Sequence, residues 1–123
     1  MIHLDTSFLI RALIPGTPEE AKLRGWLGQG EALVMSSVAW TEFLCGPLGS
    51  SDGELADRFI ECRRDFTPDQ AALAARLFNE SGRRRALLID YMIGAAALAD
   101  SAAIATSNRR DFSRFATSGL KLA

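Results

Sequence analysis

Several residue types that build common functional sites are scarce in this sequence. It contains one histidine, His3, and two cysteines, Cys45 and Cys62, whose spacing matches no metal-ligand pattern. A zinc site of the Cys/His type is therefore excluded, and no histidine or cysteine is placed to act as a catalytic nucleophile. In a chain without an export signal, two such cysteines are more often reduced, partly buried thiols than a disulfide.

Long apolar runs are also missing. The amino terminus lacks a basic start followed by an apolar stretch, so a secretory signal is not expected. The most apolar window, residues 86–99, is interrupted by Asp90 and is shorter than the roughly 20 residues that span a bilayer. No repeat or long linker divides the chain, since the turn-rich piece 46–53 is too short for one. We therefore expect a single cytoplasmic domain over residues 1–123, with no membrane association.

A basic excess is absent as well, because the net charge is −1, and this excludes a strongly basic nucleic-acid binder. Arginine nevertheless outnumbers lysine and occurs in clusters. Such clusters either cap helix ends as solvated charges or contact phosphate through the planar guanidinium. The second interpretation is favoured for Arg109 and Arg110, which neighbour a candidate site residue. The clusters are 63–64, 83–85, and 109–110 with Arg114.

Short apolar segments alternate with helical patterns along the chain. Strands are predicted at 2–4, 32–35 and 102–106, with a last edge strand at 120–122. Helices are predicted at 8–13, from Thr17-Pro18 to Gly28, and at 38–45, 52–62, 68–81, 87–99 and 111–115. This alternation predicts an α/β fold whose parallel sheet is covered on both faces. Active sites of such sheets lie beyond the carboxyl ends of the strands, which is where Asp5 and the turn 106–108 fall.

Four carboxylates stand out from the solvated acids. Asp5 ends an apolar strand, Glu42 lies on or beside an apolar helix face, and Asp111 follows a polar turn. Asp90 has only apolar helical neighbours, so it must be paired, protonated or metal-bound. Ordinary roles are the alternatives: Asp5 as a helix N-cap, Glu42 and Asp90 as ion-pair partners of arginines, and Asp111 as a helix-start acid.

Other polar residues have ordinary interpretations. Glu19 and Glu20 are expected to stabilise a helix start. Asp100, where a helix ends, is expected to be solvated. His3 is expected to be satisfied or exposed rather than to be a metal ligand.

Four converging carboxylates would favour Mg²⁺ or Mn²⁺, which prefer hard oxygen ligands. A water activated by the metal or by an acid could then attack a phosphodiester in line, with a second metal holding the leaving oxygen. The acids therefore predict metal-dependent phosphodiester hydrolysis.

The order and separation of these pieces resemble PIN-domain proteins, specifically the VapC-like toxins of bacterial toxin–antitoxin pairs. The resemblance implies a three-layer α/β/α PIN-like domain with a central, mostly parallel sheet, and a Mg²⁺- or Mn²⁺-dependent endoribonuclease. It also implies an antitoxin partner, an RNA substrate and a homodimer. Carried over by position, it implies Asp5 and Asp90 as metal contacts, Glu42 as a third acid and Asp111 as a fourth, supported by Thr6 and Asn108. The resembling segments are 2–10, 36–43, 88–97 and 106–112.

Three alternatives remain at this stage. Some members of the family place an acid where Asn108 stands, so the number of metals stays open. A PIN-like fold could serve only as a binding or scaffold module, or as a nuclease in RNA or DNA processing. A haloacid-dehalogenase-type phosphatase also begins with a strand and Asp, but it needs a second Asp where this chain has Ser7.

Overall fold

The computed structural model describes residues 1–47 and 49–123. Its sheet contains β1 (Ile2–Leu4), β2 (Leu33–Ser36), β3 (Cys62–Arg64) and β4 (Ala103–Ala105) in the order β3-β2-β1-β4. All three pairings are parallel. The predicted turn at 46–53 includes Leu48, which lies outside the described residues.

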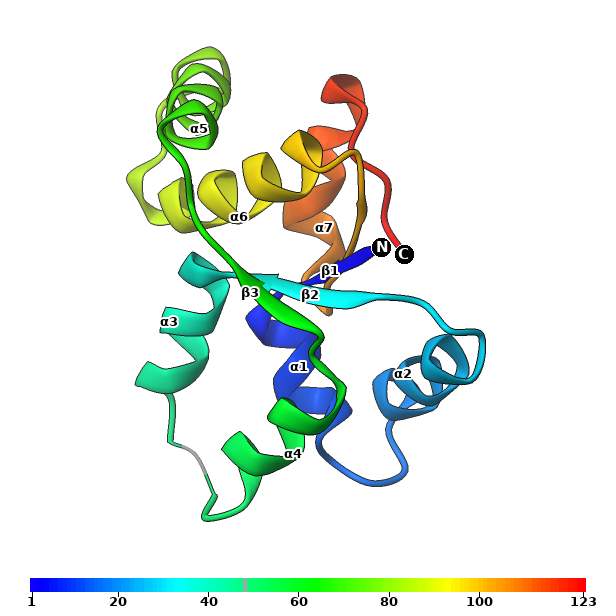
Figure 1. Ribbon diagram of the computed structural model, residues 1–123. Coiled ribbons are helices and arrows are strands. Elements are labelled where there is room, and N and C mark those ends of the chain that lie inside the picture. The colour runs from blue at the N-terminus through cyan, green and yellow to red at the C-terminus, as the bar shows by residue number, and fades with distance from the viewer. Residues whose placement is uncertain (48) are drawn as a thin grey trace.

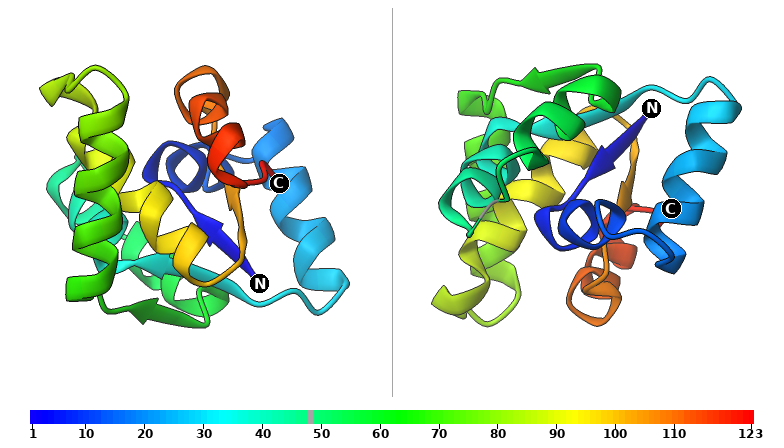
Figure 2. Two further views of the ribbon diagram at one scale, coloured as in Figure 1. Left: turned by 90° about the horizontal axis from the view of Figure 1, so that it is seen from above. Right: turned by 90° about the horizontal axis from the view of Figure 1, so that it is seen from below.

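Helices cover both faces of this sheet, which confirms the predicted three-layer α/β/α arrangement. The helices are α1 (Thr6–Ala12), α2 (Pro18–Gly28), α3 (Ser37–Cys45), α4 (Asp52–Phe59), α5 (Pro68–Glu80), α6 (Leu88–Ala99) and α7 (Arg109–Phe112), with 3-10 turns η1 (Arg85–Leu87) and η2 (Ser113–Ser118). Figure 1 shows α5, α6 and α7 on one face of the sheet and α1 to α4 on the other. In Figure 2, α6 runs alongside β1 in the view from above, and α1 lies in front in the view from below.

The strand order creates a switch point between β1 and β4. The chain moves outward from β1 to β2 and β3, and then returns across the sheet to place β4 on the other side of β1. In open parallel sheets, ligands bind beyond the carboxyl ends of the strands at such a switch point. Asp5 follows β1 and Thr106 follows β4, so both residues lie at the carboxyl ends of these two paired strands.

Local capping explains where several helices begin. Thr17 accepts a hydrogen bond from the Glu20 backbone N–H, with Pro18 in the first helical position of α2. Thr67 and Gln70 form a reciprocal capping box at α5. Ser36 accepts from the Val38 backbone N–H at α3. These three helix starts were predicted from the sequence and are confirmed.

An aromatic cluster sets α6 against α7 and η2. The ring centroids of Tyr91 and Phe115 are 5.0 Å apart, and those of Phe112 and Phe115 are 5.6 Å apart. A Cβ atom added at Gly94 would lie 2.9 Å from Phe115 Cε1, so only glycine permits this approach. The packing matters for the site because α6 carries Asp90 and α7 carries Asp111.

Two predicted elements differ from the structure. The helix expected to continue to residue 62 ends at Phe59, and Cys62–Arg64 form β3 beside β2. Arg63 and Arg64 are therefore on a strand and not at a helix end. Arg63 pairs with Asp57 and stacks over the Trp40 ring at 3.9 Å. The expected edge strand at 120–122 contributes a single parallel bridge between Leu122 and Ile104.

Cys45 and Cys62 are both free thiols, as expected from the sequence. Cys45 is exposed rather than partly buried, and Cys62 is partly buried. Within residues 1–47 and 49–123, no helix is long and apolar enough to cross a membrane.

Candidate active site

Asp5 is held at the carboxyl end of β1 by two hydroxyl groups. Its side chain is buried at 4% exposure, and its backbone N–H donates to the Ala105 carbonyl at 2.9 Å. Ser7 Oγ donates to Asp5 Oδ2 at 2.6 Å, and Thr106 Oγ1 donates to the same oxygen at 2.8 Å. Asp5 occupies the N-cap position of α1, yet its side chain makes no capping hydrogen bond to the described residues. The carboxylate is therefore directed at Ser7 and Thr106 and does not cap the helix.

Thr6 joins the start of α1 to α3. Its hydroxyl lies 2.8 Å from the Ala39 carbonyl and 3.2 Å from Glu42 Oε1, and it can donate its single proton to either acceptor. The Glu42 side chain reaches the protein surface on α3. Its pKa is raised by partial burial and by the negative charge of Asp5, while the Thr6 hydrogen bond opposes the rise. Glu42 therefore lies within electrostatic range of Asp5.

Asp90 lies in the first turn of α6, where it is partly buried. Burial is the main cause that raises its pKa from 3.8 to about 6. The charges of Asp5, Asp111 and Glu42 raise it further, and Arg114 opposes them. The charges of the other three predicted acids thus all act on Asp90, and the four acids come from four different segments of the chain.

Asp111 is connected to Asp5 through the turn that follows β4. Asn108 Nδ2 donates to Asp111 Oδ2 at 2.7 Å, and Arg114 Nη2 lies 3.3 Å from Asp111 Oδ1. The Asn108 backbone N–H donates to Thr106 Oγ1 at 2.9 Å, and Thr106 in turn donates to Asp5. Residues 106–108 therefore set two of the four acids relative to each other.

Sequence reasoning missed the roles of Ser7 and Thr106. The sequence placed Asp5 and the turn 106–108 at the active-site end of the sheet, but neither hydroxyl was predicted to bind Asp5. The sequence did contain a signal for this role. Ser7 follows the first predicted strand and Thr106 follows the strand near residue 104, and a parallel sheet can place the ends of these two strands next to each other, close to Asp5. Ser7 also stands where the phosphatase alternative requires a second Asp, and here it donates a proton to Asp5.

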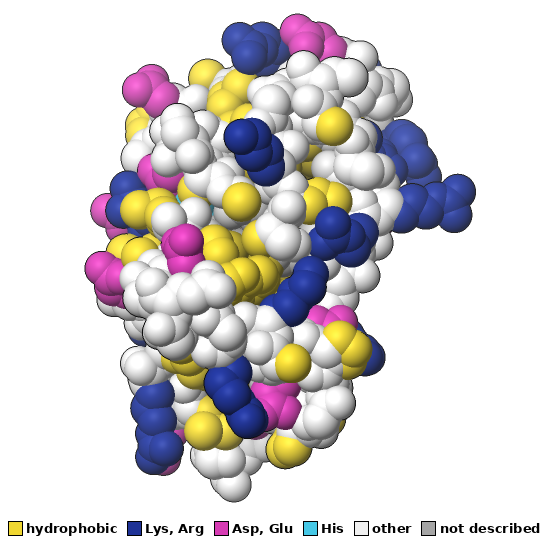
Figure 3. Space-filling view, turned by 90° about the vertical axis from the view of Figure 1, so that its right-hand side faces the viewer, with side chains coloured by type: hydrophobic (Ala, Val, Ile, Leu, Met, Phe, Trp, Pro, Cys, Tyr) yellow, Lys and Arg dark blue, Asp and Glu magenta, His cyan; other side chains and the backbone are white. Residues whose placement is uncertain are grey.

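The basic residues predicted beside the site lie at its periphery. Arg109 and Arg110 are exposed, and Arg109 Nη1 donates to the Ala123 carbonyl at 3.0 Å. Figure 3 shows that Lys and Arg on the face it presents are dispersed among acidic and apolar side chains. Arg114, in contrast, pairs with one of the four predicted acids, Asp111, at 3.3 Å.

His3 and Asp100 form a separate buried network. His3 is 1% exposed, and its Nε2 lies 2.6 Å from Asp100 Oδ2. Arg64 reaches the same carboxylate with Nε at 2.7 Å and with Nη2 at 3.1 Å. Burial is the main cause that lowers the pKa of His3. The expectation that Asp100 is solvated was wrong, because β1 and β3 bring two partners to it across the sheet.

Asp5, Glu42, Asp90 and Asp111 are called the acid cluster below, and their oxygen donors fit a hydrated Mg²⁺ or Mn²⁺ ion. All of its charged donors are carboxylate oxygens, which hard divalent cations prefer. Among residues 1–47 and 49–123, no three His, Cys, Asp or Glu side chains are gathered closely enough to form a protein-only ligand set. Mg²⁺ does not require one, because it keeps several waters and takes one or two carboxylates together with substrate phosphate.

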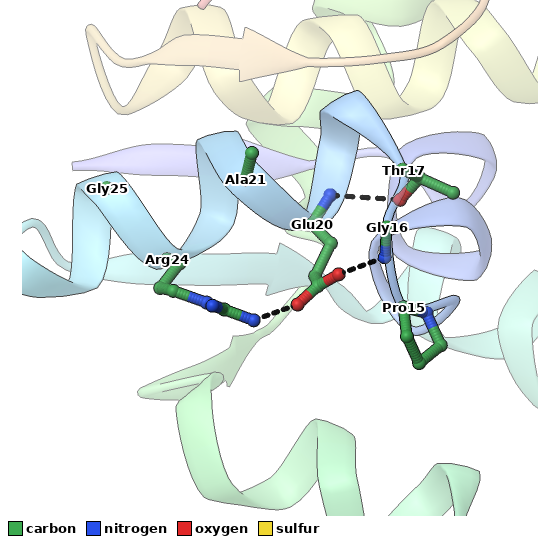
Figure 4. Close-up of a pocket in the computed structure, with 7 residues that line it drawn as sticks. All are labelled: Pro15, Gly16, Thr17, Glu20, Ala21, Arg24 and Gly25. Atoms are coloured by element: carbon green, nitrogen blue, oxygen red, sulfur yellow. Dashed lines mark hydrogen bonds and ion pairs between the residues drawn. The ribbon is translucent and has the colours of Figure 1, made fainter.

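Two surface cavities differ in their relation to the acids. A cavity of about 520 Å³ between α3 and α6 is lined by Glu42 together with Val38, Ile89 and Met92. A cavity of about 680 Å³ runs along α2 from Pro15 to Gly25 and contains none of the four acids (Figure 4). The first cavity opens beside the site, and the second lies apart from it.

Comparisons with known proteins agree with the fold described above. The model of the PIN domain family matches residues 2–117. No curated protein matches the chain. Among solved structures, the chain is similar to VapBC2 from Rickettsia felis bound to a DNA fragment from the promoter, with 19% identity, a TM-score of 0.75, and coverage of 100% of this chain and 98% of that chain. It is also similar to VapBC-1 from nontypeable Haemophilus influenzae, with 20% identity, a TM-score of 0.73, and coverage of 100% and 97%. A toxin–antitoxin complex from Klebsiella pneumoniae shows 22% identity and a TM-score of 0.69, with coverage of 91% and 90%. These likenesses concern the fold, and the family match spans nearly the whole sequence. The chain belongs to the PIN domain family.

Proposed function

We propose that this chain is a Mg²⁺- or Mn²⁺-dependent endoribonuclease and the toxin of a toxin–antitoxin pair, with residues 1–123 forming one domain. The observation that carries the proposal is the burial of Asp90 beside three further acids: burial first, and then the charges of Asp5, Asp111 and Glu42, raise its pKa to about 6. Acids from four segments that repel one another cost stability, and a bound cation would relieve that cost. Perturbed acids in such a cluster are typical of functional sites.

Each residue has a role that its contacts support. Ser7 and Thr106 both bind Asp5 Oδ2, which leaves Oδ1 as the oxygen to face a metal. Asp90 is the second metal contact, and Asp111 is the fourth acid, held by Asn108. A bound divalent cation would supply positive charge at the phosphodiester and lower the pKa of a water.

Glu42 is the acid best suited to accept a proton. Thr6 Oγ1 lies 3.2 Å from Oε1, which leaves Oε2 as the oxygen to accept the proton. A raised pKa makes the carboxylate a stronger base than an ordinary glutamate, which favours proton removal from an attacking water. Its position beside the cavity between α3 and α6 gives substrate access to it.

The partners follow from the solved structures. Those neighbours are VapBC and toxin–antitoxin complexes, and they share the fold of this chain over nearly its full length. We propose that a cognate antitoxin holds the nuclease inactive, that the substrate is RNA, and that the chain acts in the cytoplasm as a homodimer. Arg109 and Arg110, both exposed near Asp111, would contact either the RNA backbone or the antitoxin.

The test is cleavage of a mixed RNA pool by purified, antitoxin-free protein in Mg²⁺, Mn²⁺ or EDTA. Asp90→Asn should abolish cutting, whereas Asp65→Asn, the same chemical change at an exposed loop position, should leave it intact. A parallel pool of single-stranded DNA distinguishes an RNA toxin from a DNA-processing nuclease. Cutting that persists in EDTA or in Asp90→Asn would contradict the proposal. Folded protein that cuts neither pool would favour the binding-module alternative.

A further inference from the structure

Glu19 makes contacts that differ from those of the neighbouring Glu20, although both residues lie in the first turn of α2. Glu20 makes its contacts close to its own position in the chain: it accepts a hydrogen bond from the Gly16 backbone N–H and pairs with Arg24, as Figure 4 shows. Glu19 instead reaches the turn after β4, where its Oε1 accepts from Ser107 Oγ at 3.0 Å. The expectation that both acids only stabilise a helix start therefore describes Glu20 better than Glu19.

The contacts of Glu19 extend to two segments. The same Oε1 accepts from Arg11 Nε at 3.0 Å, at the last turn of α1. The pKa of Glu19 is lowered, chiefly by a hydrogen bond from its own backbone N–H and further by Ser107 and Arg11, so it remains an ionised acceptor. The Glu19 side chain is 17% exposed, and its Oε2 is buried without a hydrogen-bond partner among the described residues. Burying an unpaired carboxylate oxygen is unfavourable, so the side chain is held there by its Oε1 contacts.

A continuous series of hydrogen bonds leads from Glu19 to the acid cluster. The Ser107 backbone N–H donates to Ser7 Oγ at 3.1 Å, and Ser7 Oγ donates to Asp5 Oδ2 at 2.6 Å. On either side of Ser107 stand Thr106, which also donates to Asp5, and Asn108, which donates to Asp111. Fixing Ser107 therefore fixes the turn that orients both carboxylates.

We propose that Glu19 is a positioning residue that anchors the 106–108 turn through Ser107 and so sets Asp5 and Asp111 for metal binding. The inference rests on the proposed metal-dependent function, but the anchoring itself is a property of the metal-free protein. Residues that orient metal ligands through hydrogen bonds typically change metal affinity or activity by 10–100-fold when they are replaced.

Three variants separate the hydrogen bond from the charge. Glu19→Ala removes the acceptor, Glu19→Gln keeps an oxygen acceptor without the charge, and Glu20→Ala is the matched control in the same helical turn. Mn²⁺ affinity is measured by electron paramagnetic resonance titration of the purified protein. We expect Glu19→Ala to weaken binding about tenfold, and Glu19→Gln and Glu20→Ala to stay within about twofold of the wild type. An equal loss in Glu19→Gln and Glu19→Ala would show that charge and not positioning matters, and would overturn the proposal.

A second readout needs no metal. Backbone amide hydrogen exchange at Ser107 and Asn108 should be about tenfold faster in Glu19→Ala than in the wild type or in Glu20→Ala, because a released turn opens more often. Ser107→Ala removes the other end of the same contact and should match Glu19→Ala in both readouts, and the double variant should be no worse than either single one. Unchanged exchange in Glu19→Ala refutes the anchoring. If the wild type and Asp90→Asn bind Mn²⁺ equally weakly while exchange still responds as expected, the metal-dependent function fails and the anchoring stands.

Discussion

Replacing Asp90 by Asn removes the electrostatic cost of the acid cluster while it nearly preserves the shape of the side chain. The pKa of Asp90 is raised from 3.8 to about 6 in the folded protein. At neutral pH the group is ionised in both the folded and the unfolded state, so the folded state bears the cost of that charge. A shift of about 2 pH units corresponds to about 3 kcal/mol at 1.36 kcal/mol per unit.

The sign of the pH dependence follows from the direction of this shift. A group whose pKa is higher in the folded than in the unfolded state stabilises the protein when it is protonated. For Asp90 this contribution is fully present below pH 3.8, the unfolded value, and it is lost as the pH rises through about 6, the folded value. Asn mimics the neutral acid at every pH. Asp90→Asn should therefore match the wild type at pH 3.5 and exceed its free energy of unfolding by about 2–3 kcal/mol at pH 7.5. For a domain of this size the gain is an increase in Tm of roughly 10 °C.

Urea unfolding followed by circular dichroism, in EDTA at pH 3.5, 5.5 and 7.5, measures this difference. Asp65→Asn is the control, since Asp65 is exposed and its replacement should change stability little at any of these pH values. Added Mg²⁺ should stabilise the wild type and not Asp90→Asn. A variant that is no more stable than the wild type at pH 7.5, or equally stabilised at all three pH values, would refute the reasoning that burial and acidic neighbours make the charged form of Asp90 costly.

Three further outcomes follow from the structure. Gly94→Ala should destabilise the protein by about 1–3 kcal/mol in urea unfolding, because the new Cβ would lie 2.9 Å from a Phe115 ring atom that packed aromatic rings hold in place. An unchanged unfolding midpoint would show that α6 can shift. Thr106→Val should lower the rate of RNA cleavage about 10–100-fold while the fold is retained, because it removes the hydroxyl that orients Asp5. Thr106→Ser keeps a hydroxyl and should retain most of the wild-type rate. Equal cleavage rates for the two variants would contradict this role of Thr106. Removing both charges at Arg109–Arg110 should weaken RNA binding and reduce its salt slope by about 1 per lost phosphate contact, and no change in either quantity would favour an antitoxin-contact role.

Most of the architecture was accessible from the sequence because it depends on local patterns. The segment 2–4 and the apolar run 32–35 predict buried strands, which the structure has as β1 and β2, and the Thr-Pro pairs at 17–18 and 67–68 predict the starts of α2 and α5. The parallel α/β/α arrangement follows from the alternation of these elements. Strand β3 escaped prediction, because Cys62–Arg64 has no apolar alternation and becomes a strand only through its pairing with β2.

The four candidate acids were also selected from the sequence, since an ionisable group among apolar neighbours is anomalous in any fold. Their partners were not. Asp100 looks like a solvated helix end until β1 brings His3 and β3 brings Arg64 to it. Glu19 and Glu20 have the same local context, and only the position of α2 beside the β4 turn gives Glu19 a contact with Ser107.

The sequence by itself determined which segments form strands and helices, where several helices begin, and which carboxylates are too costly to leave without a partner. These properties depend on residues within one or two turns of each other. Only the tertiary structure decided that Asp5, Glu42 and Asp111 lie close enough to Asp90 to raise its pKa, and which hydroxyl groups orient Asp5. Such contacts join residues as far apart as Asp5 and Thr106, and the crossing of the chain at the switch point between β1 and β4 is what brings them within hydrogen-bonding distance.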